Sequence, residues 1–139
     1  MKIQEKKEIT ASLETVWKVL VDFKEYPKWN PFVKHISGEK EIGAHLDVQF
    51  SNKSVVKRNC LLSGFISPKY VSFSVTSAIG GWWYHGEHVF RLVQTENGGT
   101  DFINESYCFG LSVKFTKNKL AGWLRRGMID MNMALKEQC

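Results

Sequence analysis

The sequence predicts an α+β fold, in which antiparallel strands fill the middle of the chain and helices lie towards its two ends. Three observations support this prediction. Leu46, Val48 and Phe50 alternate with polar residues, which is the pattern of a half-buried strand. Residues 96–99, Glu-Asn-Gly-Gly, separate two long runs rich in apolar residues and form a strong hairpin signal. From about Thr116 the apolar period becomes helical, which predicts a long C-terminal helix.

The N-terminal part predicts one strand followed by an interrupted helix. Residues 2–9 have extended character, and Ser12 is suited to cap a helix that follows it. The apolar residues of this helix keep helical spacing and are Leu13, Val16, Trp17, Leu20 and Val21. Pro27 and Pro31 restrict the residues before them, so residues 22–32 are predicted to form a broken helix or tight turns.

The middle of the chain predicts six further strands. They occupy residues 34–41, 44–51, 55–66, 69–77, 82–94 and 100–111. Gly43 joins the first two of these strands, and Ser67-Pro68-Lys69 turns the next hairpin. The Asn-Gly-Gly turn described above joins the last two.

The C-terminal helix is predicted to bury one apolar stripe. Its members recur every three or four residues and are Leu120, Leu124, Met128, Met131 and Leu135. Gly122 and Gly127 interrupt this helix, each at a cost on the order of 1 kcal/mol relative to alanine. Either a close approach of the sheet or room for a ligand compensates that cost, or the glycines are simply tolerated. The sequence leaves both interpretations open.

Length and composition limit the class of protein. The chain has 139 residues, enough for one domain over residues 1–139 with a core that needs neither disulfide nor metal. Cys60, Cys108 and Cys139 show no pairing pattern, which favours a reducing cytoplasmic location. Residues 1–7 lack an apolar signal region, and no segment is apolar enough to span a membrane. We therefore expect a soluble cytoplasmic protein, whose oligomeric state the sequence does not indicate.

The chain is basic, with a formal net charge of +5. Much of the excess lies in the C-terminal helix, at Lys114, Lys117, Lys119, Arg125 and Arg126. Such a cluster can contact RNA or an anionic membrane surface, but it can equally be a solvated helix face. No RNA-binding motif accompanies these charges, so nucleic acid is not an expected partner.

A series of short motifs spans nearly the whole chain. In chain order they are Ile9-Thr10-Ala11-Ser12, Val16-Trp17, Asp22-Phe23, Tyr26-Pro27, Trp29-Asn30-Pro31-Phe32, Gly38, Gly43, Gly86-Glu87-His88-Val89-Phe90-Arg91-Leu92, Gly99-Thr100, Phe102, Gly110-Leu111 and Met131-Asn132-Met133-Ala134-Leu135-Lys136. In order and spacing this set resembles the START-like superfamily, also called SRPBCC. That group contains the birch-pollen-allergen relatives, lipid-transfer domains and polyketide cyclase/dehydrase-like proteins.

The resemblance implies a helix-grip fold. In this fold a curved antiparallel sheet wraps around a long C-terminal helix, and two short N-terminal helices close one end. It further implies an internal cavity between sheet and helix that holds a small hydrophobic or amphipathic ligand. The fold serves many activities and fixes none of them. A carrier or binding protein is the leading hypothesis, because of this resemblance and because few titratable side chains are expected to face inward.

Strand alternation and the resemblance together predict which side chains line that cavity. The resemblance places His88 and Phe102 on the inward faces of their strands. The expected ligand-binding residues are Trp29, Phe32, Phe50, Phe73, Tyr84, His88, Phe90, Asn104, Ser106, Leu124, Met128 and Met131. Apolar walls would supply binding free energy, and the few polar groups would orient the ligand.

Some of these residues admit a purely structural interpretation. His88 could instead satisfy Asn104 or Ser106 inside a filled core. Trp29 forms either an aromatic lip at the entrance or a plug that seals the core. The cluster Trp82-Trp83-Tyr84 likewise marks an interface if exposed and ordinary packing if buried.

Metal and acid–base signatures are mostly missing from the chain. His85 and His88 point to opposite faces of one strand and cannot chelate the same ion, so no metal and no cofactor are predicted. Alternation places Glu87, Asp101 and Glu105 on the outward faces, which leaves no inward carboxylate pair.

An enzyme is the alternative hypothesis. A cyclase or dehydratase acting on a polyketide-like or aromatic substrate would use His88 as general acid or base, while Tyr84, Asn104 or Ser106 positions a carbonyl. Ser106 and His88 also make a conceivable nucleophile–base pair, but no third orienting group is visible.

Overall fold

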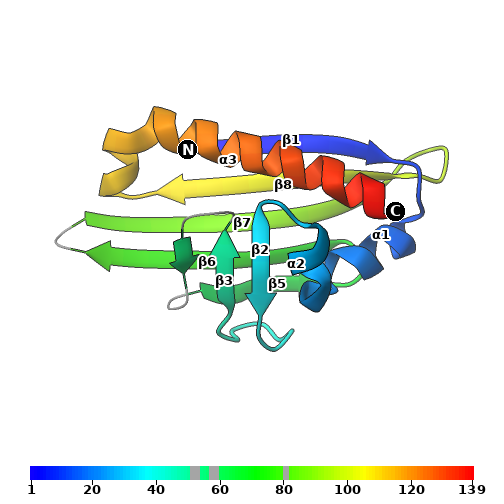
Figure 1. The fold of residues 1–139 in the computed structure, drawn as a ribbon, viewed down its shortest axis with the longest axis horizontal. Helices are drawn as coiled ribbons and strands as arrows, with labels where there is room; N and C mark the ends of the chain where they lie inside the picture. The colour runs from blue at the N-terminus through cyan, green and yellow to red at the C-terminus, as the bar shows by residue number, and fades with distance from the viewer. Residues whose placement is uncertain (51–53, 57–59, 80–81) are drawn as a thin grey trace.

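The computed structural model describes residues 1–50, 54–56, 60–79 and 82–139, and it has the predicted helix-grip arrangement (Figure 1). The larger sheet has the order β1-β8-β7-β6-β5. Its strands are β1 (Lys2–Ile9), β5 (Cys60–Ile66), β6 (Tyr70–Ile79), β7 (Trp82–Gln94) and β8 (Thr100–Phe109). The smaller sheet has the order β2-β3-β4, with β2 (Val33–Ser37), β3 (Asp47–Phe50) and β4 (Ser54–Val56).

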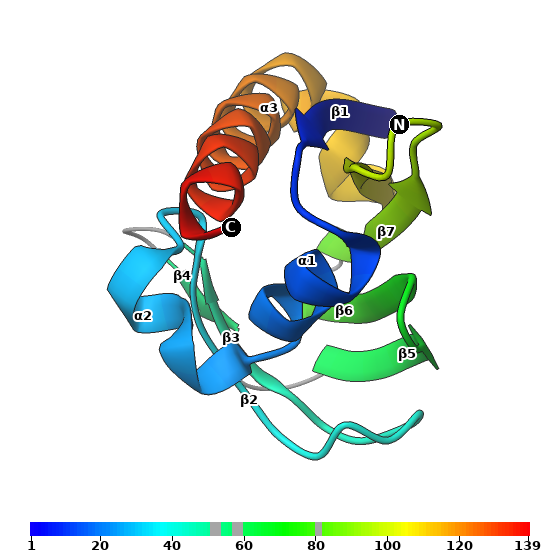
Figure 2. The ribbon, with the colours of Figure 1, turned by 90° about the vertical axis from the view of Figure 1, so that its right-hand side faces the viewer.

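One long helix and three short helical segments complete the fold. They are α1 (Leu13–Leu20), the 3₁₀ turn η1 (Phe23–Glu25), α2 (Tyr26–Trp29) and α3 (Leu111–Gln138). Helix α3 packs against β1, β7 and β8, and both α1 and α2 contact it. Seen end-on, the strands form a curved wall with α3 along one side and the short helices at the near end (Figure 2). Among the described residues, no helix combines the length and the apolarity needed to cross a bilayer.

The N-terminal segment folds as the sequence predicts. Helix α1 begins after Ser12, whose Oγ accepts a hydrogen bond from the backbone N–H of Thr15 at 3.3 Å. The predicted break follows, because the chain turns through η1 into α2 instead of extending α1. Tyr26 anchors this turn: its hydroxyl donates to the carbonyl of Leu20, and burial raises its pKa above the ordinary value.

Replacing Ser12 with alanine is expected to lower the free energy of unfolding by about 1 kcal/mol, since the first turn of α1 then loses its side-chain acceptor. Urea denaturation would measure the loss. Ser12→Asp keeps an acceptor at the same place and serves as the control. Equal losses in the two variants would contradict the assigned cap.

The strands of the smaller sheet differ in extent from the prediction. The predicted strands 34–41 and 44–51 shorten to β2 and β3, and residue 51 lies outside the described part. Gly38 and Gly43 adopt positive φ values of 144° and 89°, a conformation that favours glycine and separates the two strands by a long loop.

The prediction of one continuous strand over residues 55–66 was wrong, because the segment is divided between two strands. Its beginning belongs to β4, which pairs with β3, and its end belongs to β5, which pairs with β6. Residues 57–59 lie outside the described part. An isolated pairing of His45 with Leu61 links the two sheets. The division depends on which strands become neighbours in space, and a local pattern does not contain that information.

The β7–β8 hairpin agrees with the sequence prediction. Its register pairs Gln94 with Thr100, and the backbone N–H of Thr95 donates to the carbonyl of Gly99 at 2.9 Å. Gly98 has a φ of 83° in this turn. The Asn-Gly-Gly signal therefore located the turn correctly, because the backbone conformation it needs is available mainly to glycine.

Helix α3 begins at Leu111, five residues earlier than Thr116, and β8 ends at Phe109. The intervening Gly110 has a φ of 128°, and a side chain there would overlap the backbone of Trp83. The prediction failed because Leu111, Val113 and Phe115 alternate like a strand. The predicted buried stripe is confirmed: Leu124, Met128, Met131 and Leu135 are buried, and Leu120 is partly buried.

The two glycines of α3 have different surroundings. A Cβ at Gly127 would overlap the ring of Phe32, which is itself only 1% exposed. A Cβ at Gly122 would meet no atom within 4 Å. Close approach thus explains Gly127, whereas Gly122 is tolerated in open space.

Candidate ligand-binding interior

The inner face of β7 and β8, beneath α3, gathers the polar side chains that the sequence placed inward. The register pairs Gly86 with Cys108, His88 with Ser106 and Phe90 with Asn104. His88, Asn104 and Ser106 are all at most 3% exposed. Since residues two apart on a strand share a face, these side chains form adjacent rows facing the helix.

His88 lies in a box of aromatic rings. It stacks on Phe73 with 5.2 Å between ring centroids and an interplanar angle of 23°, and it lies 5.0 Å from the ring of Phe50. The ring of Phe32 approaches it edge-on at 6.2 Å. Burial removes the ring from solvent, which disfavours the charged imidazolium and lowers the pKa of His88 to about 4. His88 is therefore a neutral imidazole at neutral pH.

The Nδ1 atom of His88 is buried and has no hydrogen-bond partner among the described residues. Such an atom costs roughly 1–3 kcal/mol if nothing satisfies it. The interpretation that His88 merely satisfies Asn104 or Ser106 finds no support at this nitrogen.

Asn104 joins the sheet to the helix. Its Nδ2 donates to Oδ1 of Asn132 on α3 at 3.0 Å and lies 3.8 Å from the sulfur of Met131. Its Oδ1 atom is buried without a partner among the described residues. Asn132, only 3% exposed, was absent from the predicted site. Its position four residues after Met128 places it beside the apolar stripe, which was the available signal.

Tyr84, Ser106 and Cys108 form a second polar group on the same face. The Tyr84 hydroxyl lies 3.4 Å from the Cys108 sulfur, and the Ser106 hydroxyl lies 3.7 Å from it. The tyrosine ring lies over Gly86, where a Cβ would overlap the hydroxyl. Burial, followed by the thiol contact, raises the pKa of Tyr84, so its phenol stays neutral.

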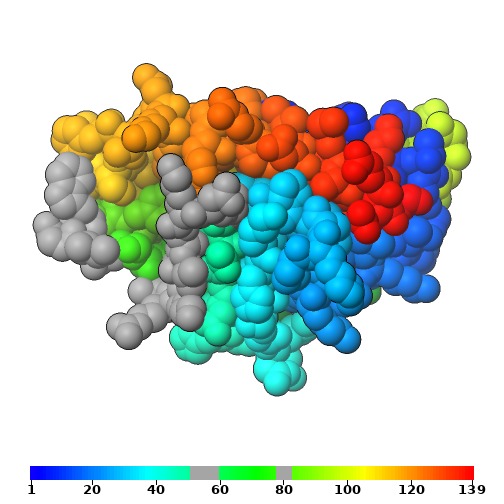
Figure 3. Space-filling view, viewed as in Figure 1, coloured from blue at the N-terminus to red at the C-terminus, as the bar shows by residue number. Residues whose placement is uncertain are grey.

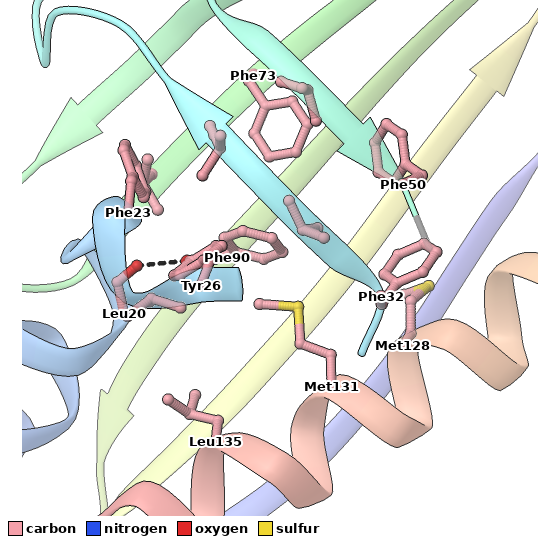
Figure 4. Close-up of a cluster of buried hydrophobic side chains, with 14 of the residues drawn as sticks. Leu20, Phe23, Tyr26, Phe32, Phe50, Phe73, Phe90, Met128, Met131 and Leu135 are labelled. Atoms are coloured by element: carbon pink, nitrogen blue, oxygen red, sulfur yellow. Dashed lines mark hydrogen bonds between the residues drawn. The ribbon is translucent and has the colours of Figure 1, made fainter. Parts of the chain in front are cut away.

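Buried apolar side chains from the strands and from α3 cluster between the sheet and the helix (Figure 4). Phe32, Phe50, Phe73 and Phe90 come from the strands and from the segment after α2, while α3 contributes Leu124, Met128 and Met131. All seven side chains are at most 4% exposed. The structure thus brings together eleven of the twelve predicted site residues in one interior.

Trp29 is the exception. Its ring packs edge-on against Tyr26 at 5.1 Å, and its Nε1 atom is buried without a partner in the described part of the chain. It also lines a hollow of about 320 Å³ formed by α1, α2 and the end of α3, together with Lys18, Val19, Asp22, Glu25, Lys28 and Gln138. Trp29 therefore lies among the short N-terminal helices, apart from the polar rows of β7 and β8.

The exposure of Trp83 and Tyr84 answers part of the question raised by the aromatic cluster at the start of β7. Trp83 is 51% exposed, whereas Tyr84 is half-buried over the inner face. The side chain of Trp82 lies outside the described part.

Charged side chains lie on the outer face of the sheet. Glu105 accepts a hydrogen bond from Arg91 at 2.8 Å, and Glu87 accepts one from Ser63 at 3.1 Å. The His85 ring contacts Thr76 on that same side. Over the described residues, no three side chains of the metal-binding types cluster together.

A charged pair between β1 and α3 lies beside the polar rows. Glu5 faces Asn104 across the β1–β8 pairing, and its carboxylate accepts a hydrogen bond from Arg125 of α3. Because these two charges satisfy each other, the polar groups that the described part of the interior offers to a ligand are uncharged amide, imidazole, phenol and hydroxyl groups.

Solved structures from several organisms share this architecture. A protein from Mesorhizobium loti matches with a TM-score of 0.79 at 15% identity, covering 99% of this chain and 96% of that one. The Zhui aromatase/cyclase of a Streptomyces species matches with a TM-score of 0.76 at 11% identity, covering 99% and 92%. A point mutant of Thalictrum flavum norcoclaurine synthase, in complex with a transition-state analogue, matches at 0.65 and 14%, covering 100% and 96%. At these identities the likeness concerns the fold alone.

Curated proteins provide no match. The sequence itself, however, matches the family described as "Polyketide cyclase / dehydrase and lipid transport" over residues 1–138. The matched region includes every described strand of both sheets and the whole of α3, so the resemblance seen in the short motifs extends over the chain. This protein belongs to the polyketide cyclase/dehydrase and lipid transport family.

Proposed function

We propose that this protein binds one small hydrophobic or amphipathic molecule between α3 and the concave face of the sheet, and that it acts as a carrier. The observation that supports this most is a pair of buried polar atoms, Nδ1 of His88 and Oδ1 of Asn104, which have no hydrogen-bond partner among the described residues and lie in a mostly apolar interior. Buried polar atoms in folded proteins nearly always have partners. A ligand that supplies the missing hydrogen bonds accounts for both atoms.

The chemistry of the two atoms describes the polar end of the ligand. His88 and Asn104 are diagonal neighbours on one face, at a spacing of roughly 7–8 Å between Cα atoms. The Asn104 oxygen can only accept a hydrogen bond, whereas the imidazole nitrogen can donate or accept according to its tautomer. A hydroxyl group on the ligand has the chemistry that both atoms need, because it can donate to the Asn104 oxygen and accept from the protonated imidazole nitrogen.

The apolar end would lie against the methionines of α3. Met128 and Met131 are fully buried in the structure without ligand. An unbranched thioether has several rotatable bonds and repacks around guests of different shape. These side chains are therefore the ones that make room when a ligand enters.

The cyclase or dehydratase alternative has less support. The Tyr84 hydroxyl forms a hydrogen bond with the Cys108 sulfur, whereas the enzyme hypothesis needs it to position a substrate carbonyl beside His88. A pKa near 4 leaves His88 without a proton to give at neutral pH and makes it a weak base. Binding without turnover is therefore the function we favour.

Two matched probes would test the proposal, 2-naphthol and naphthalene, which differ by one hydroxyl group. Both should bind, with fluorescence reporting the change of environment. His88→Phe should weaken the affinity for 2-naphthol by roughly 5- to 150-fold, equivalent to about 1–3 kcal/mol for one hydrogen bond to a buried group. The affinity for naphthalene should hardly change in the same variant.

A second variant tests the location of the site. Met128→Trp should abolish binding of both probes while leaving a folded protein, destabilised by about 1–3 kcal/mol of overpacking. Met133→Trp is the matched control, since Met133 lies on the same helix but is 51% exposed. Unchanged binding in both His88→Phe and Met128→Trp would place the site elsewhere and overturn the proposal.

A further inference from the structure

Helix α3 carries a second apolar stripe on the side opposite the core. Its exposed members are Leu111, Phe115, Ile129 and Met133, at 42%, 67%, 40% and 51% exposure. At 100° per residue these positions fall within about 40° of one another around the helix. Gly122, also exposed, lies in the middle of the same line. Scattered exposed apolar residues are ordinary, but alignment along one helix line is a pattern that marks an interaction surface.

Positive charge flanks this outer stripe. From Leu111 to Met133 the helix contains five lysines and arginines and one acidic residue, Asp130. Arg125 is paired with Glu5, whereas Lys114, Lys119 and Arg126 have no ion-pair partner within the described ranges. All three of these side chains are exposed. The stripe therefore consists of two apolar pairs, Leu111 with Phe115 and Ile129 with Met133, and the basic residues lie on the stretch of helix between and beside them.

The position of α3 makes this surface accessible. The helix runs along one edge of the molecule, and in the space-filling view its side chains form an uninterrupted outer ridge (Figure 3). From Leu111 to Met133 the stripe is about 33 Å long at a rise of 1.5 Å per residue. The whole length can lie flat on a planar partner.

We propose that α3 docks this outer stripe on an anionic lipid bilayer, with the apolar side chains entering the headgroup region and the flanking cations facing acidic lipid headgroups. Helices that lie in a bilayer surface have this composition: an apolar face bordered by lysine and arginine. The alternative occupant is a second copy of the chain. A second copy would bring an equally basic helix and the same net charge of +5, so the charges oppose self-association and complement an anionic surface.

Vesicle flotation tests the proposal with the full-length protein. Vesicles of phosphatidylglycerol mixed with phosphatidylcholine should carry the protein upward, and vesicles of phosphatidylcholine alone should do so roughly tenfold less. Raising the salt concentration should weaken binding to the anionic vesicles, because screening acts on the exposed lysines and arginine.

The double variant Ile129→Ser/Met133→Ser should reduce binding to anionic vesicles about tenfold or more, since it removes apolar contact while leaving every charge in place. Ile42→Ser is the matched control: Ile42 is 68% exposed but belongs to the loop between β2 and β3. Circular dichroism would verify that α3 remains folded in each variant.

Two results would overturn the proposal. One is equal flotation of the wild-type protein and the double variant, or no flotation of either. The other is a concentration-dependent dimer in sedimentation experiments that the double variant abolishes, which would identify a second copy of the chain as the occupant of the stripe. Neither result bears on the interior, so the proposed ligand binding is tested separately by the naphthol probes.

Discussion

Gly127→Ala is expected to lower the free energy of unfolding by about 1–3 kcal/mol, even though alanine is the better helix former. The added Cβ would overlap the buried ring of Phe32. That ring cannot move aside easily, because Phe50 and Trp123 each pack against it with centroids 5.4 Å away. Urea denaturation of the variant and the wild type would give the difference.

Gly122→Ala provides the matched control within the same helix. No atom lies within 4 Å of the new Cβ, so only helix propensity acts and the variant should gain about 0.5–1 kcal/mol. If both alanine variants stabilised the protein equally, the close packing of Phe32 on α3 would be wrong.

The wild-type protein is expected to lose up to about 3 kcal/mol of stability through His88 as the pH falls from about 6.5 towards 4. An unfolded histidine takes up a proton near its ordinary pKa of about 6.5. In the folded protein the buried ring resists protonation until the pH approaches about 4. Within that interval the unfolded state binds more protons, so acid favours unfolding, and the contribution is absent above the upper limit.

His88→Phe should remove this part of the pH dependence and preserve the ring stacking on Phe73. The difference between variant and wild type isolates His88, since the other titrating groups contribute to both proteins. His85→Phe is the control, because His85 lies on the outer face beside Thr76. Parallel stability curves for wild type and His88→Phe between pH 7 and pH 4 would contradict the burial of an unsatisfied imidazole.

Local patterns predicted the parts of the fold that depend on neighbouring residues. The Asn-Gly-Gly turn, the Ser12 cap and the stripe through Met128 and Met131 were correct, because turn conformation, capping and helical period are properties of short segments. The start of α3 was misplaced where Leu111 begins an alternation that a strand would also show. The division between β4 and β5 depends on long-range pairing, which local periodicity does not encode.

The candidate site shows the same limit. Alternation, together with the family resemblance, identified the inward faces that hold His88 and Asn104. It could not identify Asn132 as the partner of Asn104, because that hydrogen bond depends on how α3 lies over the sheet. Alternation also could not predict the contact between the Tyr84 hydroxyl and Cys108, because that contact requires the tyrosine ring to lie over Gly86, which has no side chain.

The hydrogen bond between Asn104 and Asn132 fixes where along its own axis α3 can rest on the sheet. Sliding the helix by one turn would bring Met128 or Lys136 opposite Asn104. The first leaves the amide without its acceptor, and the second carries an ammonium group towards an apolar interior, which is costly without a partner. The apolar stripe alone would accept several such positions, since its members are similar in size and shape. The polar pair thus acts together with the close fit of Gly127 against Phe32 in selecting one docking position, which the leucines and methionines of the stripe would barely distinguish by themselves.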